Sequence, residues 1–230
     1  MVEPYTKEAI VGRGIMKKVI TVSIYNPRDN TKDKHHKVDN TPYGGGPGMV
    51  MMADPLVKTL EKIKQKIARR TLRPLRPLRQ AQGGQAQGKK AQVKVKIIMT
   101  SPRGKELTNE YADNVIQKKY TDIIFICGRY EGIDARVKKI FKAEDVSIGN
   151  YVLTGGELPA LVMLDCIARR IPGVLGNSES IEENRISTDE VYTRPEVYEN
   201  KGKKYRVPKI LLSGHAKKIE EWREERSKKL

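Results

Sequence analysis

Four glycine-rich loops hold the residues of this 230-residue chain that are best suited to chemistry. Glycine lets a backbone come close to a ligand and present N–H groups to it. No G-x-x-x-x-G-K-[ST] motif occurs, and no G-x-G-x-x-G motif follows a predicted strand, so a nucleotide-phosphate site is not predicted. A single such loop is more often a plain turn, but several at one sheet edge favour a ligand site. Their sequences are PYGGGPGM at 42–49, TSPRGK at 100–105, CGRYEG at 127–132 and SIGNYVLTGGE at 147–157.

Charged side chains lie in or near the same loops. Arg129 and Glu131 lie in the loop at 127–132, and Arg169 and Arg170 end a predicted helix. Each also has an ordinary structural interpretation. Arg169 would be a cation favoured at a helix C-terminus, and Glu131 would cap a helix N-terminus. The residues alone do not decide between these structural roles and a role in a ligand-binding or catalytic site.

A loop rich in aspartate and histidine near the N-terminus could suggest a metal site. The spacing of these residues fits no standard ligand set, so we expect a solvated loop. The residues concerned are Asp29, Asp33, His35, His36 and Asp39.

The loops are positioned by alternating strands and helices. The run DIIFIC at 122–127 is typical of a buried parallel strand. Strand–helix alternation predicts an α/β fold with a parallel sheet, which binds ligands at the carboxyl ends of its strands. Three of the four loops follow predicted strands. The predicted strands are residues 93–99, 122–127 and 145–148, and the predicted helices are 55–68, 108–119, 134–141 and 158–170.

The remaining segments are less regular. We predict a helix over 4–18, a half-buried strand over 17–24 and a polar loop over 26–40. Residues 69–90, RRTLRPLRPLRQAQGGQAQGKK, predict a low-complexity surface insertion. Residues 176–208 are polar and are expected to be irregular. Residues 215–229 predict a charged helix that carries Trp222.

The amino-acid composition indicates which binding partners and which cellular environment to expect. Lys and Arg number 45 against 28 Asp and Glu, which gives a net charge of +17 and favours a nucleic-acid partner. Cys127 and Cys166 lie far apart without close metal-ligating neighbours, so neither a zinc site nor a disulfide framework is expected. We expect a soluble protein of the reducing cytoplasm, with no membrane span and no signal peptide.

Six sequence runs resemble the tRNA (guanine-N1)-methyltransferase family called TrmD, of the SPOUT class. They are PYGGGPGM, CGRYEGID, SIGNYVLTGGELPA, RIPGVLG, YTRPEV and SGH. The resemblance extends from about residue 5 to residue 226, apart from the insertion. It implies methylation of N1 of guanosine 37 in tRNA, next to the anticodon, with S-adenosylmethionine as donor. It also implies an α/β fold with a deep trefoil knot, a homodimer with the active site between subunits, and magnesium without an identifiable ligand set.

The resemblance also assigns site residues. Catalytic roles fall to Arg169, Asn184, Glu131 and Glu183. The donor site would be lined by Pro102, Gly128, Ile148, Gly149, Asn150, Tyr151, Val152, Leu153 and Gly155. The tRNA would contact Tyr43, Gly44, Gly45, Gly46, Arg129 and His215.

The chain departs from the family pattern at several points. Asn184 stands where the family has its general-base aspartate, so Glu183 or Asp189 would have to replace it. The family usually begins with a further strand and ends with a longer helical domain. We therefore expect a methyltransferase domain over 1–176, a flexible linker over 177–208 and a truncated helical tRNA-binding domain over 209–230. The rival hypotheses are a weak or inactive RNA-binding relative that keeps the donor pocket, and a SPOUT enzyme with another nucleoside target.

Overall fold

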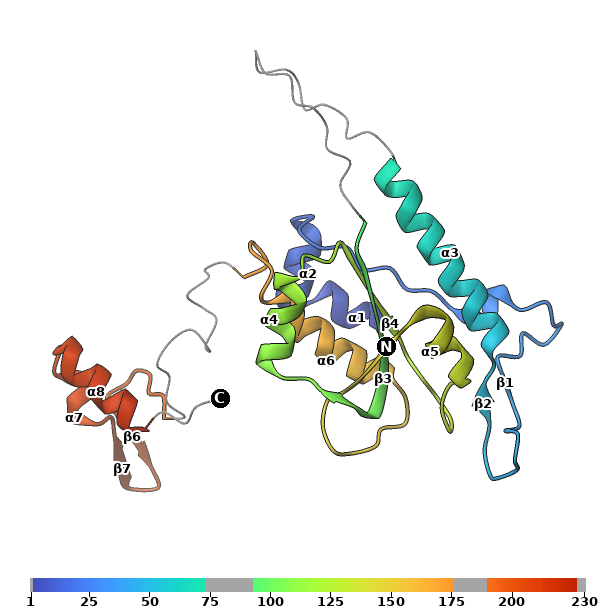
Figure 1. Ribbon diagram of the computed structural model, residues 1–230. Coiled ribbons are helices and arrows are strands. Elements are labelled where there is room, and N and C mark those ends of the chain that lie inside the picture. The colour runs from blue at the N-terminus through green and yellow to red at the C-terminus, as the bar shows by residue number, and fades with distance from the viewer. Residues whose placement is uncertain (1, 73–92, 176–189, 227–230) are drawn as a thin grey trace, which may run out of the picture. The chain divides into compact units, whose positions relative to one another are not determined.

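The structure is a computed structural model that describes residues 2–72, 93–175 and 190–226 (Figure 1). The chain divides into two compact units, Met1–Val174 and Leu175–Leu230. Each unit is described by itself. Within the described ranges, no helix has the length and apolar character to cross a membrane.

The first unit is built on a three-stranded parallel sheet with the order β4-β3-β5. The central strand β3 pairs with β4 through residues such as Ile97 opposite Ile124, and with β5 through Thr100 opposite Val146. The predicted α/β fold with a parallel sheet is therefore confirmed. The strands are β3 (Val95–Glu106), β4 (Asp122–Ile126) and β5 (Glu144–Ser147).

Helices cover both faces of this sheet (Figure 1). Side chains alternate along a strand, so Ile97 and Met99 of β3 pack on one face and Ile98 packs on the other. One core joins the sheet to α3 and α5, and the second joins it to α4 and α6. Burial on both faces explains why this strand is apolar from Ile123 to Ile126. The helices are α3 (Ala53–Leu72), α4 (Asn109–Gln117), α5 (Ala135–Phe141) and α6 (Glu157–Ala168).

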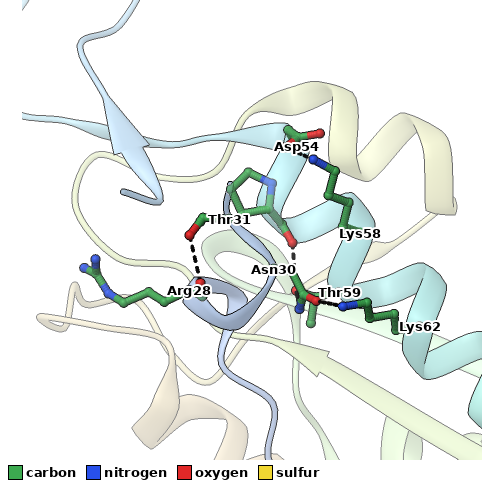
Figure 2. A network of polar contacts seen from close by, with 8 residues as sticks. Arg28, Asn30, Thr31, Asp54, Lys58, Thr59 and Lys62 are labelled. Atoms are coloured by element: carbon green, nitrogen blue, oxygen red, sulfur yellow. Dashed lines mark hydrogen bonds and ion pairs between the residues drawn. The ribbon is translucent and has the colours of Figure 1, made fainter. Parts of the chain in front are cut away.

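A polar network fixes the N-terminal loop on α3 (Figure 2). The short helix η1 (Pro27–Asn30) ends at Asn30, whose side-chain amide donates to the Thr59 hydroxyl at 2.8 Å. That hydroxyl donates to the Pro55 carbonyl oxygen at 2.7 Å, and Lys62 donates to the Asn30 amide oxygen. The chain then passes through β1 (Asp39–Asn40) and β2 (Val50–Met51), which hold the glycine-rich loop between them.

The predicted N-terminal elements are partly wrong. The helix expected over 4–18 is two helices, α1 (Val2–Lys7) and α2 (Ala9–Met16). The half-buried strand expected over 17–24 is absent from the described chain. Lys18 has a φ of +58°, which ends α2, and the Val19 N–H donates back to the Gly14 carbonyl oxygen at 3.0 Å. The alternating apolar residues are not evenly buried either, since Ile24 is exposed.

The segment TSPRGK was expected to be a loop after the first strand, but it lies inside β3. The pairing with β5 shifts between Thr100 and Lys105, because both lie opposite Val146. The strand therefore bulges at 101–104 and continues to Glu106. The predicted insertion also begins later than expected, because Arg69 and Arg70 belong to the last turns of α3. Its residues 73–90 lie outside the described chain.

The described part of the second unit, residues 190–226, contains a hairpin and two helices. The irregular structure expected over 176–208 is wrong at β6 and β7, which pair antiparallel. The charged helix expected over 215–229 is found as α8. The elements are β6 (Val197–Asn200), β7 (Lys203–Arg206), α7 (Lys209–Leu212) and α8 (Ala216–Arg226).

Candidate active site

Main-chain hydrogen bonds gather the glycine-rich loops at one edge of the sheet. The Glu131 N–H donates to the Met49 carbonyl oxygen at 3.0 Å, which joins the loop at 127–132 to the loop at 42–49. The Gly156 N–H donates to the Gly128 carbonyl oxygen at 2.7 Å, which joins it to the loop at 147–157. These bonds make three of the four predicted segments neighbours, and the two that follow β4 and β5 are close because parallel strands end at the same edge.

Gly156 marks the point where three of these segments cross. A methyl group built on Gly156 would lie 2.1 Å from the Thr100 hydroxyl oxygen and 2.7 Å from the Gly128 nitrogen. These separations leave no room for any side chain. Gly156 also precedes α6, where it occupies the N-cap position with an ordinary φ of −81°. Close packing of backbones, rather than unusual backbone conformation, requires glycine here.

Gly48 allows the loop at 42–49 to pack closely against the loop at 127–132. Its φ is +80°, and a methyl group there would lie 2.7 Å from the Glu131 carboxylate oxygen. The Glu131 side chain is therefore placed beside the loop at 42–49. The interpretation of Glu131 as a helix cap is wrong, because Asp134 caps α5 by accepting from the Arg136 N–H.

An ion pair crosses the site from the second loop to the start of α6. The Arg129 guanidinium donates to Glu157 at 2.8 Å. This hydrogen bond and the carboxylate charge raise the pKa of Arg129. Sequence reasoning missed Glu157 and Gly156, although a Gly-Glu pair at the start of a predicted helix is a recognisable signal. Beside them, burial raises the pKa of Cys127 to about 12, so its thiol stays protonated at neutral pH.

The loop after β5 is held rigidly but carries uncovered apolar side chains. The Ser147 hydroxyl accepts from the Gly149 N–H at 3.1 Å and donates to the Gly149 carbonyl oxygen at 2.8 Å. Gly149 has a φ of +151°, and the Tyr151 hydroxyl donates to the Ile148 carbonyl oxygen at 3.2 Å. Tyr151, Val152 and Leu153 are nevertheless exposed, with Val152 at 82%. A preformed loop with bare apolar groups suits an apolar ligand surface or another subunit.

The other residues predicted for the site lie in less crowded positions. Pro102 is exposed on the bulge of β3. Tyr43 is fully exposed, and a methyl group built on Gly44, Gly45 or Gly46 would meet nothing within 4 Å. His215 lies in the second unit, where its carbonyl oxygen accepts from Ile219 at 3.0 Å. Asn184, Glu183 and Asp189 lie outside the described residues.

Arg169 is not brought to the loops within one chain. It is the C-cap residue of α6, whereas the loops lie at the N-terminus of that helix. A helix of 12 residues is about 18 Å long at 1.5 Å per residue. The next residue, Arg170, is buried and pairs with Asp113 at 2.8 Å.

The family model for "tRNA (Guanine-1)-methyltransferase TrmD" matches this chain over residues 1–230. The chain belongs to the TrmD family. A relative named tRNA (guanine-N(1)-)-methyltransferase from Pseudoalteromonas atlantica is 38% identical over 231 residues, which cover 99% of this chain and 76% of the relative. Relatives of the same name from Buchnera aphidicola and Clostridioides difficile are each 40% identical. The matches cover 95% and 97% of this chain, and 81% and 86% of those relatives.

Membership in the TrmD family accounts for the clustering of the glycine-rich motifs on one sheet edge. The motifs that carried the resemblance, such as CGRYEGID and SIGNYVLTGGELPA, are the segments that cross at Gly156. Metal-ligating residues do not gather in the same way, since no group of three or more His, Cys, Asp or Glu in the described ranges could hold a metal ion. Asp33 instead stabilises its own turn by accepting from the Lys37 and His35 N–H groups, and these bonds lower its pKa.

Proposed function

We propose that this chain transfers a methyl group from S-adenosylmethionine to N1 of guanosine 37 in tRNA. The observation that carries the proposal is the crossing of three glycine-rich segments at Gly156, in a chain of the TrmD family. Membership in the TrmD family is what supports a SPOUT-type trefoil knot near the end of the sheet. The segments from Gly128 and from Ile148 to Gly155 would then line the donor site.

The residues at this crossing fit the donor. A methyl group built on Gly128 would meet only the Ile133 side chain, at 3.5 Å, so the space beside Gly128 is otherwise open. Within the described chain, the Val152 and Leu153 N–H groups donate to no backbone oxygen, so they are available to a purine. Tyr151 and Leu153 offer exposed apolar surface. When bound, S-adenosylmethionine supplies a methyl group that is activated by its sulfonium.

The position of Arg169 supports a homodimer. Leu158, Val162 and Arg169 are spaced i, i+4 and i+11, so they lie along one side of α6. Leu158 and Val162 are exposed in the single chain, although α6 is apolar. Two copies of α6 packed antiparallel about a twofold axis would cover these side chains. They would also place Arg169 of one subunit beside the donor loops at the start of α6 in the other.

Each side chain of the proposed site then has a separate role in the methyl transfer. N1 of guanine carries a proton, which a general base must remove as the methyl group arrives. Negative charge that develops on O6 would be stabilised by the Arg169 guanidinium. Glu183 or Asp189 would accept the proton, because the amide of Asn184 has no useful basicity. Glu131, held beside Gly48, would orient the guanine edge that faces the exposed loop.

The exposed basic surface would hold the RNA. The guanosine must leave the anticodon stack to reach the donor, as bases generally do in enzymes that modify them. Tyr43 and the open glycines beside it would receive it, with Arg129 close to the same edge. The net charge of +17 and the helix after His215 would bind the tRNA backbone in the cytoplasm. Any magnesium would act without a ligand set among the described residues.

Calorimetric titration with S-adenosylmethionine, followed by nucleoside analysis of the treated tRNA, tests this proposal. We expect one donor site per chain and 1-methylguanosine as the product. Donor binding without a methylated product would instead support an inactive RNA-binding relative. A different methylated nucleoside would overturn the target.

A further inference from the structure

The hairpin of the second unit is a two-stranded ribbon that extends away from α7 and α8 (Figure 1). Its two strands pair antiparallel from Val197 opposite Arg206 to Asn200 opposite Lys203. The two turn residues, Lys201 and Gly202, have φ values of +50° and +75°. Positive φ at both positions is the type I′ turn, whose twist matches that of the flanking strands. The turn therefore fixes the register of every cross-strand pair.

This register places two tyrosines directly opposite each other. Tyr198 pairs with Tyr205, and the alternation of side chains puts Asn200 and Lys203 on the same face. Tyr198 is 63% exposed and Tyr205 is 50% exposed. The Lys203 ammonium lies 5.4 Å from the centre of the Tyr205 ring. One face of the ribbon is therefore an uncovered aromatic platform with a cation at its edge.

The hairpin also has a strong excess of positive charge. Residues 197–206 contain four cations, Lys201, Lys203, Lys204 and Arg206, and one anion, Glu199, which gives 4 − 1 = +3. Glu199 lies on the opposite face from the tyrosines, across from Lys204. A protein-binding surface usually has few lysines at its centre. Exposed rings bordered by lysines instead complement the bases and phosphates of single-stranded RNA.

We infer that the β6–β7 hairpin is a binding site for unpaired RNA. Bases of a single-stranded segment stack on Tyr198 and Tyr205, while Lys203 contacts the phosphate next to the stacked base. Stacking tolerates any base, so the hairpin contributes affinity rather than the choice of the methylated nucleotide. This inference depends on the proposed function in one respect only, which is that the natural RNA is tRNA.

The test compares three variants of the full chain. Tyr198→Thr with Tyr205→Thr removes both rings but keeps residues that favour strands. Tyr198→Phe with Tyr205→Phe keeps the rings and removes only the hydroxyls. Glu199→Thr with Lys204→Thr is the matched control, because it places the same residues on the opposite face without changing net charge. Binding of fluorescent oligouridylate and of a blunt RNA duplex of equal length is followed by fluorescence anisotropy.

We expect the tyrosine-to-threonine variant to bind oligouridylate roughly tenfold or more weakly, with a smaller change for the duplex. The phenylalanine variant and the opposite-face control should stay within about twofold of the unaltered chain. Unchanged oligouridylate binding by the threonine variant would overturn the inference. So would an equal loss for duplex and single strand, or a change in self-association alone, which would indicate a protein partner.

Methyl transfer by the unaltered chain, measured in parallel, separates this inference from the proposed function. Failure to methylate tRNA would count against the proposed function while RNA binding by the hairpin could still be observed. Loss of structure is controlled by circular dichroism of each variant. If the threonine variant is unfolded, the comparison of Tyr205→Thr with Tyr205→Phe alone decides the question.

Discussion

Arg170 ties two helices of the first unit together from the end of α6. Its side chain is only 4% exposed, and its guanidinium donates to Asp113 at 2.8 Å and Asn109 at 2.7 Å. It also donates to the Cys166 carbonyl oxygen at 2.7 Å. This buried guanidinium stabilises one arrangement of α4 and α6, because its hydrogen bonds to Asp113 and Asn109 join the two helices.

The stability of the fold should therefore depend on Arg170. We expect Arg170→Ala to lower the free energy of unfolding by about 2 kcal/mol, because the change removes a buried side chain and its charge-assisted hydrogen bonds, while Asp113 is half exposed and remains hydrated. Arg70→Ala is the control, because Arg70 pairs with Asp122 through a side chain that is 59% exposed. That change should cost less than about 1 kcal/mol. Urea unfolding followed by circular dichroism measures both, and equal losses would contradict the role given to Arg170.

Asn184 gives the second prediction at this scale. If Asn184 stands at the general-base position, restoring a carboxylate with Asn184→Asp should raise the single-turnover methylation rate. The gain should approach the range of about 10²–10⁴ that a placed base contributes. If Glu183 or Asp189 already serves as the base, Glu183→Gln or Asp189→Asn should abolish turnover and Asn184→Asp should change little. Unaltered turnover in all three variants would exclude every one of these assignments.

The sequence could not distinguish the neighbouring arginines at the end of α6. Both end a helix in a basic chain, and a cation at a helix C-terminus has an ordinary electrostatic explanation. Successive helical residues point in directions about 100° apart, so Arg170 can be buried against α4 while Arg169 lies on the side of Leu158. Only packing against the neighbouring helix separates a structural arginine from a catalytic candidate.

At the scale of elements, Gly156 and Gly128 have different roles where the loops meet. A methyl group on Gly156 would collide with backbone atoms, whereas one on Gly128 would make an ordinary contact with Ile133. We expect Gly156→Ala to cost about 1–3 kcal/mol of stability because the segments must separate. Gly128→Ala should change stability by less than about 0.5 kcal/mol and weaken donor binding at least tenfold. Thermal unfolding and calorimetry with S-adenosylmethionine check both, and tight donor binding by Gly128→Ala would refute the proposed lining.

A second contact between elements makes stability depend on pH. Glu144 of β5 accepts from Lys96 of β3 and from the Tyr111 hydroxyl of α4 at 3.0 Å. Partial burial alone would raise the pKa of Glu144, but these two hydrogen bonds outweigh it and lower the pKa below its ordinary value of 4.5. A lowered folded-state pKa means that the contribution is fully present above about pH 4.5 and is lost as the pH falls below it.

Glu144→Gln should therefore lower stability by about 1 kcal/mol at pH 7. The difference from the unaltered chain should shrink as the pH falls from about 5 to about 3, because the native carboxylate becomes protonated there. Urea unfolding at several pH values measures this difference. A gap that stays constant across the range would show that the charge of Glu144 contributes nothing.

Strong local patterns predicted most of the elements in the first unit. The run at 123–126 is apolar because both faces of the parallel sheet are covered. The helical repeat of α3 is shown by Leu56, Leu60, Ile63 and Ile67. The strand expected over 17–24 failed because its alternation has no partner strand in the described chain. The β6–β7 hairpin was missed because almost all of its side chains are exposed, so it has no hydrophobic alternation to recognise.

At the scale of the whole molecule, some features of the site could be predicted from the sequence and others could not. The sequence could predict that the loops at 127–132 and 147–157 lie together, because both follow parallel strands that end at one edge. The distance of Arg169 from those loops could not be predicted, because it depends on the length and orientation of α6. That distance of about 18 Å makes a second subunit part of the proposed mechanism, because Leu158 and Val162 of α6 are exposed in the single chain.

The central claim is methyl transfer to the guanosine next to the anticodon. Its most direct test is incubation of the purified chain with labelled S-adenosylmethionine and two tRNA transcripts that differ only in carrying G or A at that position. N1 of adenine carries no proton for a base to remove, and its 6-amino group offers no O6 for Arg169 to stabilise. We expect label in the G transcript, recovered as 1-methylguanosine, and none in the A transcript. Equal labelling of both transcripts, or label in neither, would contradict this claim.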